Sequence, residues 1–113
     1  MSRRRYLLAS VIAVTGFGAL FMALPSQGAG VRVKIVDFRY QPSSITVHVG
    51  RAATFSNDTT LTHTATCPDC GVDSGDIQPA TFKTLTFNKA GRFELSCRYH
   101  GSQGMVATVT VEP

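Results

Sequence analysis

Apolar and polar residues alternate along most of the chain after residue 30. Val31, Val33 and Ile35 alternate with Arg32 and Lys34, and this period of two predicts a half-buried strand because successive side chains of a strand point to opposite faces. Similar patterns predict further short strands at residues 45–49, 52–56, 63–66, 82–87, 93–97 and 106–111. Residues 71–79 are rich in Gly, Asp, Ser and Pro and are predicted to form a loop. About seven to eight short strands at regular spacing predict one all-β domain, a sandwich or a barrel.

The first thirty residues differ from the rest and are predicted to be an export signal. Arg3, Arg4 and Arg5 precede an uncharged apolar stretch over residues 6–24, and small residues follow it. This order is typical of a signal peptide that is removed, so we expect a signal over residues 1–30 and a domain over residues 31–113. The arginines also resemble a twin-arginine signal. An uncleaved membrane anchor through residues 6–24 is the alternative, because about 20 apolar residues can span a bilayer. Either reading places the domain in the periplasm or otherwise outside the cytoplasm.

The basic character of the chain comes mainly from this first segment. The chain has 11 Lys and Arg against 7 Asp and Glu, and three arginines lie in the predicted signal, so residues 31–113 carry 8 against 7, a net charge of +1. No basic cluster remains in the domain, and we expect no nucleic-acid partner. We expect a monomer. A domain this small builds a modest core, which a metal ion or a disulfide would stabilise further.

One cluster of residues carries recognisable metal chemistry. Cys97, His100 and Met105 are spaced C-x2-H-x4-M at the end of the penultimate predicted strand, so a loop between neighbouring strands presents three donors together. His63 lies 34 residues before Cys97, in a segment that could pack beside this loop. Taken singly, Cys97 would be a buried thiol and Met105 a core residue. Together, two imidazoles, a thiolate and a thioether are the ligand set of a blue-copper electron-transfer site. The sequence therefore predicts one copper ion bound by His63, Cys97, His100 and Met105.

The residues around these donors resemble the cupredoxin family. Ser96–Val106 is most similar to the plastocyanin and pseudoazurin branch, which uses the same C-x2-H-x4-M loop. Further similarity lies in Phe38-x-Tyr40-x-Pro42, Val47-x-Val49-Gly50, Asn57 and Asp73-Ser74-Gly75. The resemblance spans residues 31–113 and implies a Greek-key β-sandwich, one copper ion, and single-electron transfer between larger redox proteins.

Three positions depart from the pattern of that branch. Ser96 stands where plastocyanins usually carry an aromatic residue, Thr64 where Asn is common, and Tyr99 where Pro is frequent. All four candidate ligands are retained. These three positions bear on the reduction potential and on the route of the electron, since neighbouring contacts tune both. We expect the electron to leave through His100, with a redox donor and acceptor docking transiently near it.

The segment Cys67-Pro68-Asp69-Cys70 has more than one interpretation. In an exported protein a C-x-x-C pair most often closes a disulfide, which would leave Cys97 as the free thiol for a metal. A separate weak metal site and a redox-active dithiol are the alternatives. Extended chain between His63 and Cys67 spans roughly 13 Å, so Cys67 shares a metal with His63 only if the strand breaks.

The histidine content favours an electron carrier over an enzyme. The chain has three histidines, and after His63 and His100 only His48 remains. His48 alternates with Val47 and Val49 and is predicted to lie exposed on a strand. Copper enzymes of this type need a second, histidine-rich centre for substrate, so we expect no enzymatic activity. The alternative is a periplasmic copper-binding or copper-delivery protein that uses Cys67 and Cys70.

Overall fold

The computed structural model describes residues 30–113. The predicted signal peptide, with its alternative of an anchor through residues 6–24, lies outside this part of the chain. Within it, no helix has the length and apolar character needed to cross a membrane. The strands are β1 (Val31–Val36), β2 (Arg39–Gln41), β3 (Ser44–His48), β4 (Arg51–Asn57), β5 (Thr66–Cys67), β6 (Val72–Asp73), β7 (Phe82–Phe87), β8 (Gly91–Ser96) and β9 (Val106–Glu112), and the 3-10 helices are η2 (Pro68–Cys70) and η3 (Gly101–Gln103).

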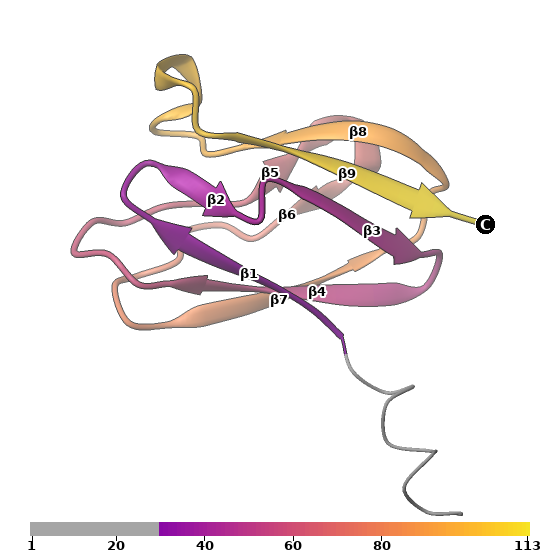
Figure 1. The fold of residues 1–113 in the computed structure, drawn as a ribbon, viewed down its shortest axis with the longest axis horizontal. Helices are drawn as coiled ribbons and strands as arrows, with labels where there is room; N and C mark the ends of the chain where they lie inside the picture. The colour runs from indigo at the N-terminus through magenta and orange to yellow at the C-terminus, as the bar shows by residue number, and fades with distance from the viewer. Residues whose placement is uncertain (1–29) are drawn as a thin grey trace, which may run out of the picture.

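The strands form two sheets that pack face to face, as Figure 1 shows. One sheet has the order β2-β1-β4-β7 and the other β3-β9-β8-β5-β6. Both are mixed: β1 pairs with β4 and β3 with β9 in parallel, whereas the remaining pairs are antiparallel. The predicted all-β sandwich is therefore confirmed.

The core lies between the two sheets and follows the period-two pattern of the sequence. In β9, for example, alternate residues are buried because one face of the strand packs against the opposite sheet. Each sheet contributes buried apolar side chains, among them Val33, Ile35, Phe55 and Phe87 from one sheet and Val47, Leu95, Val109 and Val111 from the other. This packing holds the strand ends, and the loops that leave them, in fixed positions.

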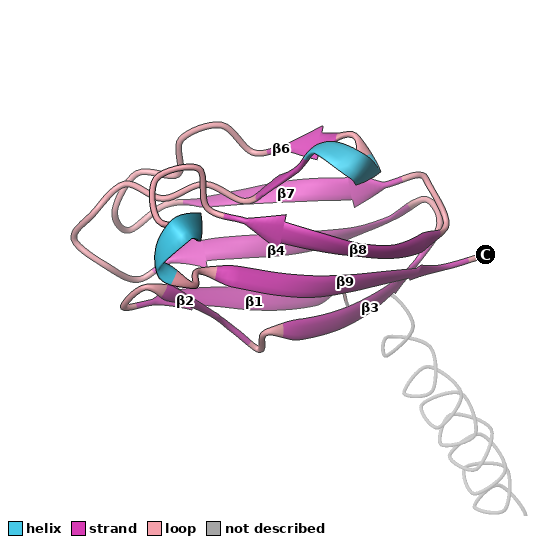
Figure 2. Cartoon of the chain, turned by 90° about the horizontal axis from the view of Figure 1, so that it is seen from above, coloured by secondary structure: helices cyan, strands magenta, loops and turns pink. Residues whose placement is uncertain are grey.

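The structure differs from the predicted elements in the middle of the chain. The predicted strand over residues 63–66 is wrong in its extent: His63 makes an isolated bridge with Ile77, and only Thr66 and Cys67 form β5. Part of the predicted loop over residues 71–79 is the short strand β6. Two 3-10 helices, which the sequence pattern did not predict, are visible in Figure 2 (cyan). Elements of two or three residues are too short to leave a periodic pattern.

Tyr40 connects β2 to the segment that follows His63. Its side chain is 1% exposed, and its hydroxyl donates a hydrogen bond to the backbone oxygen of Thr64 at 2.5 Å. Burial, and secondarily Cys97, raises the pKa of Tyr40, so the phenol stays protonated and remains a donor. This bond ties an otherwise irregular segment to the sandwich.

We expect Tyr40→Phe to lower the free energy of unfolding by about 1–3 kcal/mol, because a buried carbonyl loses its donor while the ring still fills the core. Urea denaturation of the copper-free protein measures the change. Thr84→Val is the control, since the Thr54–Thr84 hydrogen bond lies on an exposed face and its loss should cost less than about 0.5 kcal/mol. Equal unfolding midpoints for Tyr40→Phe and wild type would show that the Tyr40 bond contributes nothing.

Candidate metal centre

Three predicted ligands meet at one end of the sandwich, opposite the C-terminus. His63 lies in the loop after β4, Cys97 directly follows β8, and His100 precedes η3. Figure 1 shows that the β8–β9 connection and the loops after β1 and β4 lie at this same end. The fold thereby brings His63 beside residues more than thirty positions away in sequence.

The donor atoms of these residues are close enough to bind one metal ion. The Cys97 sulfur lies 3.8 Å from Nδ1 of His63 and 3.5 Å from Nδ1 of His100, and all three donor atoms lie within 4.8 Å of one another. Metal–sulfur and metal–nitrogen bonds with such ligands are about 2.3 and 2.0 Å for zinc. One ion can therefore reach the sulfur and each nitrogen at ordinary bond lengths. Among residues 30–113 this is the only group of His, Cys, Asp or Glu with such spacing.

Met105 lies at the other end of the same loop. It is fully buried, and its backbone closes the loop: the Cys97 amide donates to the Met105 oxygen at 3.2 Å, and the Met105 amide donates to the His100 oxygen at 3.3 Å. Gly104 precedes it with φ of +94°, a left-handed conformation that glycine adopts without strain. The turn at Gly104 thus returns Met105 to the side of the other candidate ligands.

The two imidazoles have different environments. His63 is fully buried, whereas His100 is partly exposed at the surface. Burial, and secondarily the nearby His100, lowers the pKa of His63, so this ring is neutral near pH 7. Nε2 of His63 is buried without a hydrogen-bond partner, which leaves Nδ1 as the atom through which this ring acts.

Thr64 joins the His63 segment to the ligand loop. Its amide points at the Cys97 sulfur at 3.4 Å, and its hydroxyl oxygen accepts a hydrogen bond from the amide of Arg98 at 2.8 Å. An N–H group directed at sulfur stabilises negative charge there. Thr64 is itself fully buried, so these bonds are shielded from water.

Asn57 fixes the loop that carries His63. It is fully buried, and its amide nitrogen donates to the backbone oxygens of Leu61 and Ile77, each at 2.8 Å. Its side-chain oxygen accepts bonds from the amide and the hydroxyl of Thr59. Asn57 is the last residue of β4 and a buried anchor of this loop.

The aromatic rings of Phe38 and Tyr99 lie beside His100, and the sequence pattern did not identify either as part of the site. The Phe38 ring lies 4.9 Å from the His100 ring, centroid to centroid, and the Tyr99 ring lies 6.3 Å from it. Both side chains are about half exposed, at 47% and 49%. Tyr99 is adjacent to the ligand in sequence, but nothing in the local pattern places Phe38 there, because the contact depends on where the β1–β2 loop packs.

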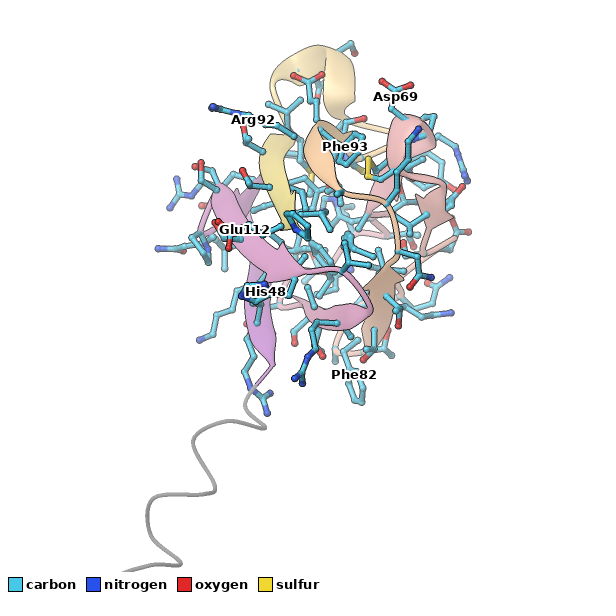
Figure 3. All side chains as sticks on the ribbon, turned by 90° about the vertical axis from the view of Figure 1, so that its right-hand side faces the viewer. His48, Asp69, Phe82, Arg92, Phe93 and Glu112 are labelled. Carbon is cyan, nitrogen blue, oxygen red and sulfur yellow. A yellow bond between two sulfur atoms is a disulfide. The ribbon has the colours of Figure 1, made fainter. Side chains whose placement is uncertain are left out.

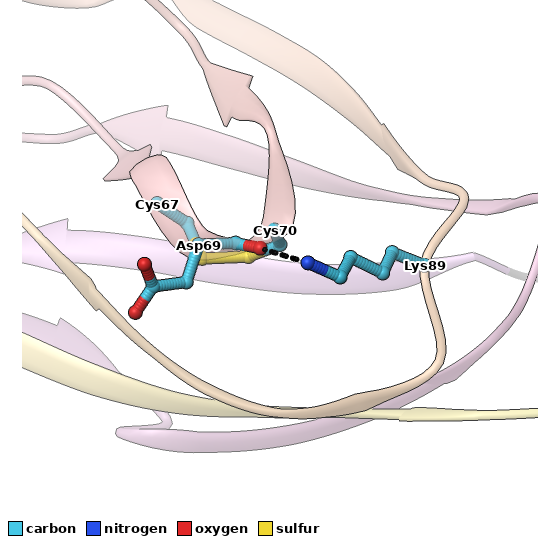
Figure 4. Close-up of a disulfide and its surroundings, with 4 residues drawn as sticks. All are labelled: Cys67, Asp69, Cys70 and Lys89. Atoms are coloured by element: carbon cyan, nitrogen blue, oxygen red, sulfur yellow. Dashed lines mark hydrogen bonds between the residues drawn. A yellow bond between two sulfur atoms is a disulfide. The ribbon is translucent and has the colours of Figure 1, made fainter.

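Other residues that the sequence singled out lie away from this centre. A disulfide joins Cys67 and Cys70 across η2, as Figure 4 shows, and Cys97 is the free cysteine of the described chain. His48 is exposed at the opposite end of the sandwich, where it faces Glu112 at 3.8 Å (Figure 3). Neither His48 nor the cysteine pair takes part in the metal centre.

Comparisons with known proteins agree with this architecture. Structures of amicyanin mutants match the chain: a Cu(I) form with TM-score 0.64, 22% identity and coverage of 74% of this chain and 82% of that chain, and a reduced form with TM-score 0.65, 23% identity and coverage of 75% and 84%. An oxidised form matches with TM-score 0.64, 24% identity and coverage of 74% and 82%. Identities this low show a shared fold. Curated protein sequences gave no significant match.

A family model adds evidence from the sequence itself. The model of the cupredoxin-like domain matches residues 8–111, which is most of the chain. The fold, this match and the geometry around His63, Cys97, His100 and Met105 together show that the chain belongs to the cupredoxin family and that its site fits one copper ion.

Proposed function

We propose that the protein is a type 1 blue-copper electron carrier, in which His63, Cys97 and His100 would bind the ion and the Met105 thioether would be a weaker fourth donor. The convergence of two Nδ1 atoms on the Cys97 sulfur carries this proposal. Bound copper supplies a one-electron couple between Cu(I) and Cu(II). Thiolate and thioether suit Cu(I), while imidazole also suits Cu(II), so this mixed set serves both oxidation states.

The protein's own part in electron transfer is to hold the donors still. Cys97 and His63 are buried, and the hydrogen bonds of Thr64 and Asn57 fix the segments that carry them. A rigid set of donors leaves little ligand movement when the charge on the ion changes, and pre-arranged groups incur no reorganisation cost during the reaction. This rigidity favours rapid electron exchange.

The partly exposed His100 provides the route by which the electron leaves. Phe38 and Tyr99 flank its ring and are themselves half exposed, so the surface around the imidazole is largely aromatic. Small, transient contacts are typical of redox complexes. We propose that a redox donor and acceptor dock on this end in turn. The net charge of +1 over residues 31–113 offers little long-range attraction for either partner.

Two related interpretations are less well supported. A copper enzyme would need a further substrate-binding centre, and His48, the remaining histidine, lies at the far end beside Glu112. A copper-delivery function would need free thiols at Cys67 and Cys70, but these are disulfide-bonded and at most 6% exposed. Export through the segment over residues 1–30 remains our prediction and is consistent with a disulfide, since such bonds persist in oxidising compartments.

Cys97→Ser tests the proposed function most simply. We expect the intense visible absorption of the copper-loaded protein to disappear, because a serine hydroxyl stays protonated near neutral pH and forms no thiolate-to-copper charge-transfer band. Absorption spectra of the copper-loaded variant measure this, with circular dichroism to establish that the sandwich persists. Ser102→Ala, in the exposed helix η3 of the same loop, is the control and should stay blue. An intensely blue Cys97→Ser protein would refute the ligand set.

Met105→Gln tests the axial ligand. The amide oxygen is a harder donor than a thioether and stabilises Cu(II), so the reduction potential should fall while copper stays bound. Met105→Leu offers no donor and should move the potential in the opposite direction. Cyclic voltammetry of both variants gives the two shifts. Potentials equal to that of wild type in both variants would show that Met105 is a core residue without contact to the ion.

The cysteine pair is tested by alkylation of the purified, copper-free protein. Under denaturing conditions without reductant, iodoacetamide should modify one of the three cysteines, Cys97, because a disulfide protects the other two. With reductant, mass spectrometry should find all three modified. Modification of Cys67 and Cys70 before reduction would contradict the disulfide and would return them to consideration as metal ligands.

A further inference from the structure

The two residues that separate Cys97 from His100 are both bonded to a distant segment. The guanidinium of Arg98 meets a carboxylate oxygen of Asp73 at 2.5 Å. The hydroxyl of Tyr99 donates to a carboxylate oxygen of Asp76, also at 2.5 Å. Both carboxylates belong to the short segment that begins in β6, so one segment contacts the whole stretch between the two proposed ligands.

Residues 73–76 are themselves held in place. One oxygen of Asp73 accepts bonds from the amide of Gly75 at 2.9 Å and the hydroxyl of Thr66 at 3.1 Å. The Ser74 amide donates to the Ala65 oxygen at 3.0 Å, and the Ala65 amide donates to the Ser74 hydroxyl oxygen at 2.8 Å. The Gly75 amide, more than any other group, lowers the pKa of Asp73. Asp73 is therefore an ionised acceptor at a fixed position.

The same segment continues into Ile77, which contacts the other half of the site. The His63 amide donates to the Ile77 oxygen at 3.2 Å, and the Ile77 amide donates to the His63 oxygen at 2.7 Å. The chain from Asp73 to Ile77 thus bonds to the backbone of one proposed ligand and to the side chains that flank the other two. It links the two parts of the ligand set across the end of the sandwich.

A chain of hydroxyl groups extends this link into the interior. Thr66 donates to Asp73 at 3.1 Å, and its oxygen lies 2.9 Å from the hydroxyl oxygen of Thr64. A hydroxyl has one proton, so Thr66 accepts from Thr64 while it donates to Asp73. The Thr64 hydroxyl oxygen in turn accepts a hydrogen bond from the Arg98 amide at 2.8 Å. Because the Arg98 guanidinium bonds to Asp73, these hydrogen bonds form a closed ring through Asp73, Thr66, Thr64 and Arg98. Such a ring stabilises one conformation of the ligand loop.

We propose that residues 73–76 form a positioning strap for the ligand loop, with Asp73 and Asp76 as its two positioning residues. The strap rests on the proposed function, because its role is to keep the Cys97 sulfur and the His100 Nδ1 at a separation that suits the ion in both oxidation states. The segment after His100 contains Gly101 and Gly104 and is not tied in this way by side chains. The strap therefore acts on the part of the loop where the ligands lie.

The strap contacts are partly exposed, which limits the effect of each one. The side chains of Arg98 and Asp73 are 50% and 44% exposed, and Tyr99 is 49% exposed. An exposed ion pair or hydrogen bond is expected to slow loss of the metal by up to about fivefold, or about 1 kcal/mol. Both contacts join the same two segments, and residues 98 and 99 are adjacent, so their effects are coupled and should combine to less than their product.

The test measures how fast reduced copper leaves the full-length protein. Cu(I)-loaded wild type, Asp73→Asn, Tyr99→Phe and the double variant are mixed with excess bicinchoninic acid, and the coloured Cu(I) chelate is followed over time. Asp69→Asn is the matched control, because it removes a carboxylate at the end of the sandwich far from the site (Figure 3). The backbone oxygen of Asp69 accepts a hydrogen bond from Lys89 at 3.1 Å (Figure 4), and the substitution leaves that bond in place. Melting temperatures of the copper-free variants and visible spectra of the oxidised ones are recorded alongside.

We expect release to be up to about fivefold faster in each single variant and faster again in the double variant, by less than the product of the two single effects because the contacts join the same two segments. Asp69→Asn should stay within twofold of wild type. The charge-transfer band should shift in the strap variants and not in the control. Release rates and spectra that match the control, with lower melting temperatures alone, would overturn the strap. A wild type without a charge-transfer band would instead refute the proposed function itself.

Discussion

The hydrogen bonds of Thr64 hold the two halves of the copper site together. One half is the buried segment with His63, and the other is the loop between β8 and β9 with Cys97 and His100. The Thr64 amide donates a hydrogen bond to the Cys97 sulfur. The Thr64 hydroxyl oxygen accepts one from the Arg98 amide, and the Thr64 carbonyl oxygen accepts one from the Tyr40 hydroxyl. Through its polar groups this one residue therefore joins its own segment twice to the ligand loop and once to β2.

This arrangement explains how a small domain maintains a precise site. The two sheets fix the ends of β4 and β8, but the ligands lie in loops beyond those ends, where strand pairing no longer acts. Buried hydrogen bonds replace the strand pairing there, and unmade bonds in such an interior would be costly. Asn57 does the same for the loop before His63. The ligand geometry thus depends on a few buried polar side chains more than on the hydrophobic core itself.

The sequence predicted the long strands and the ligand loop well, for a physical reason. Period-two alternation reports directly on a buried face, and the spacing of Cys97, His100 and Met105 is a local property of one loop. It did not predict β5 and β6, which are two residues long. The position of Phe38 over His100 and the bonds from Asp73 and Asp76 to the loop also escaped prediction. These contacts join segments that only the folded sandwich brings together, so no local pattern records them.

The proposed function requires a single copper ion that cycles by one electron in a thiolate-containing site. A redox titration of the copper-loaded full-length protein, followed by its visible spectrum, tests this most directly. We predict one charge-transfer band of high intensity per copper ion, which one electron equivalent bleaches and reoxidation restores in full. A weak visible spectrum at full copper occupancy, or loss of the ion on reduction, would contradict it.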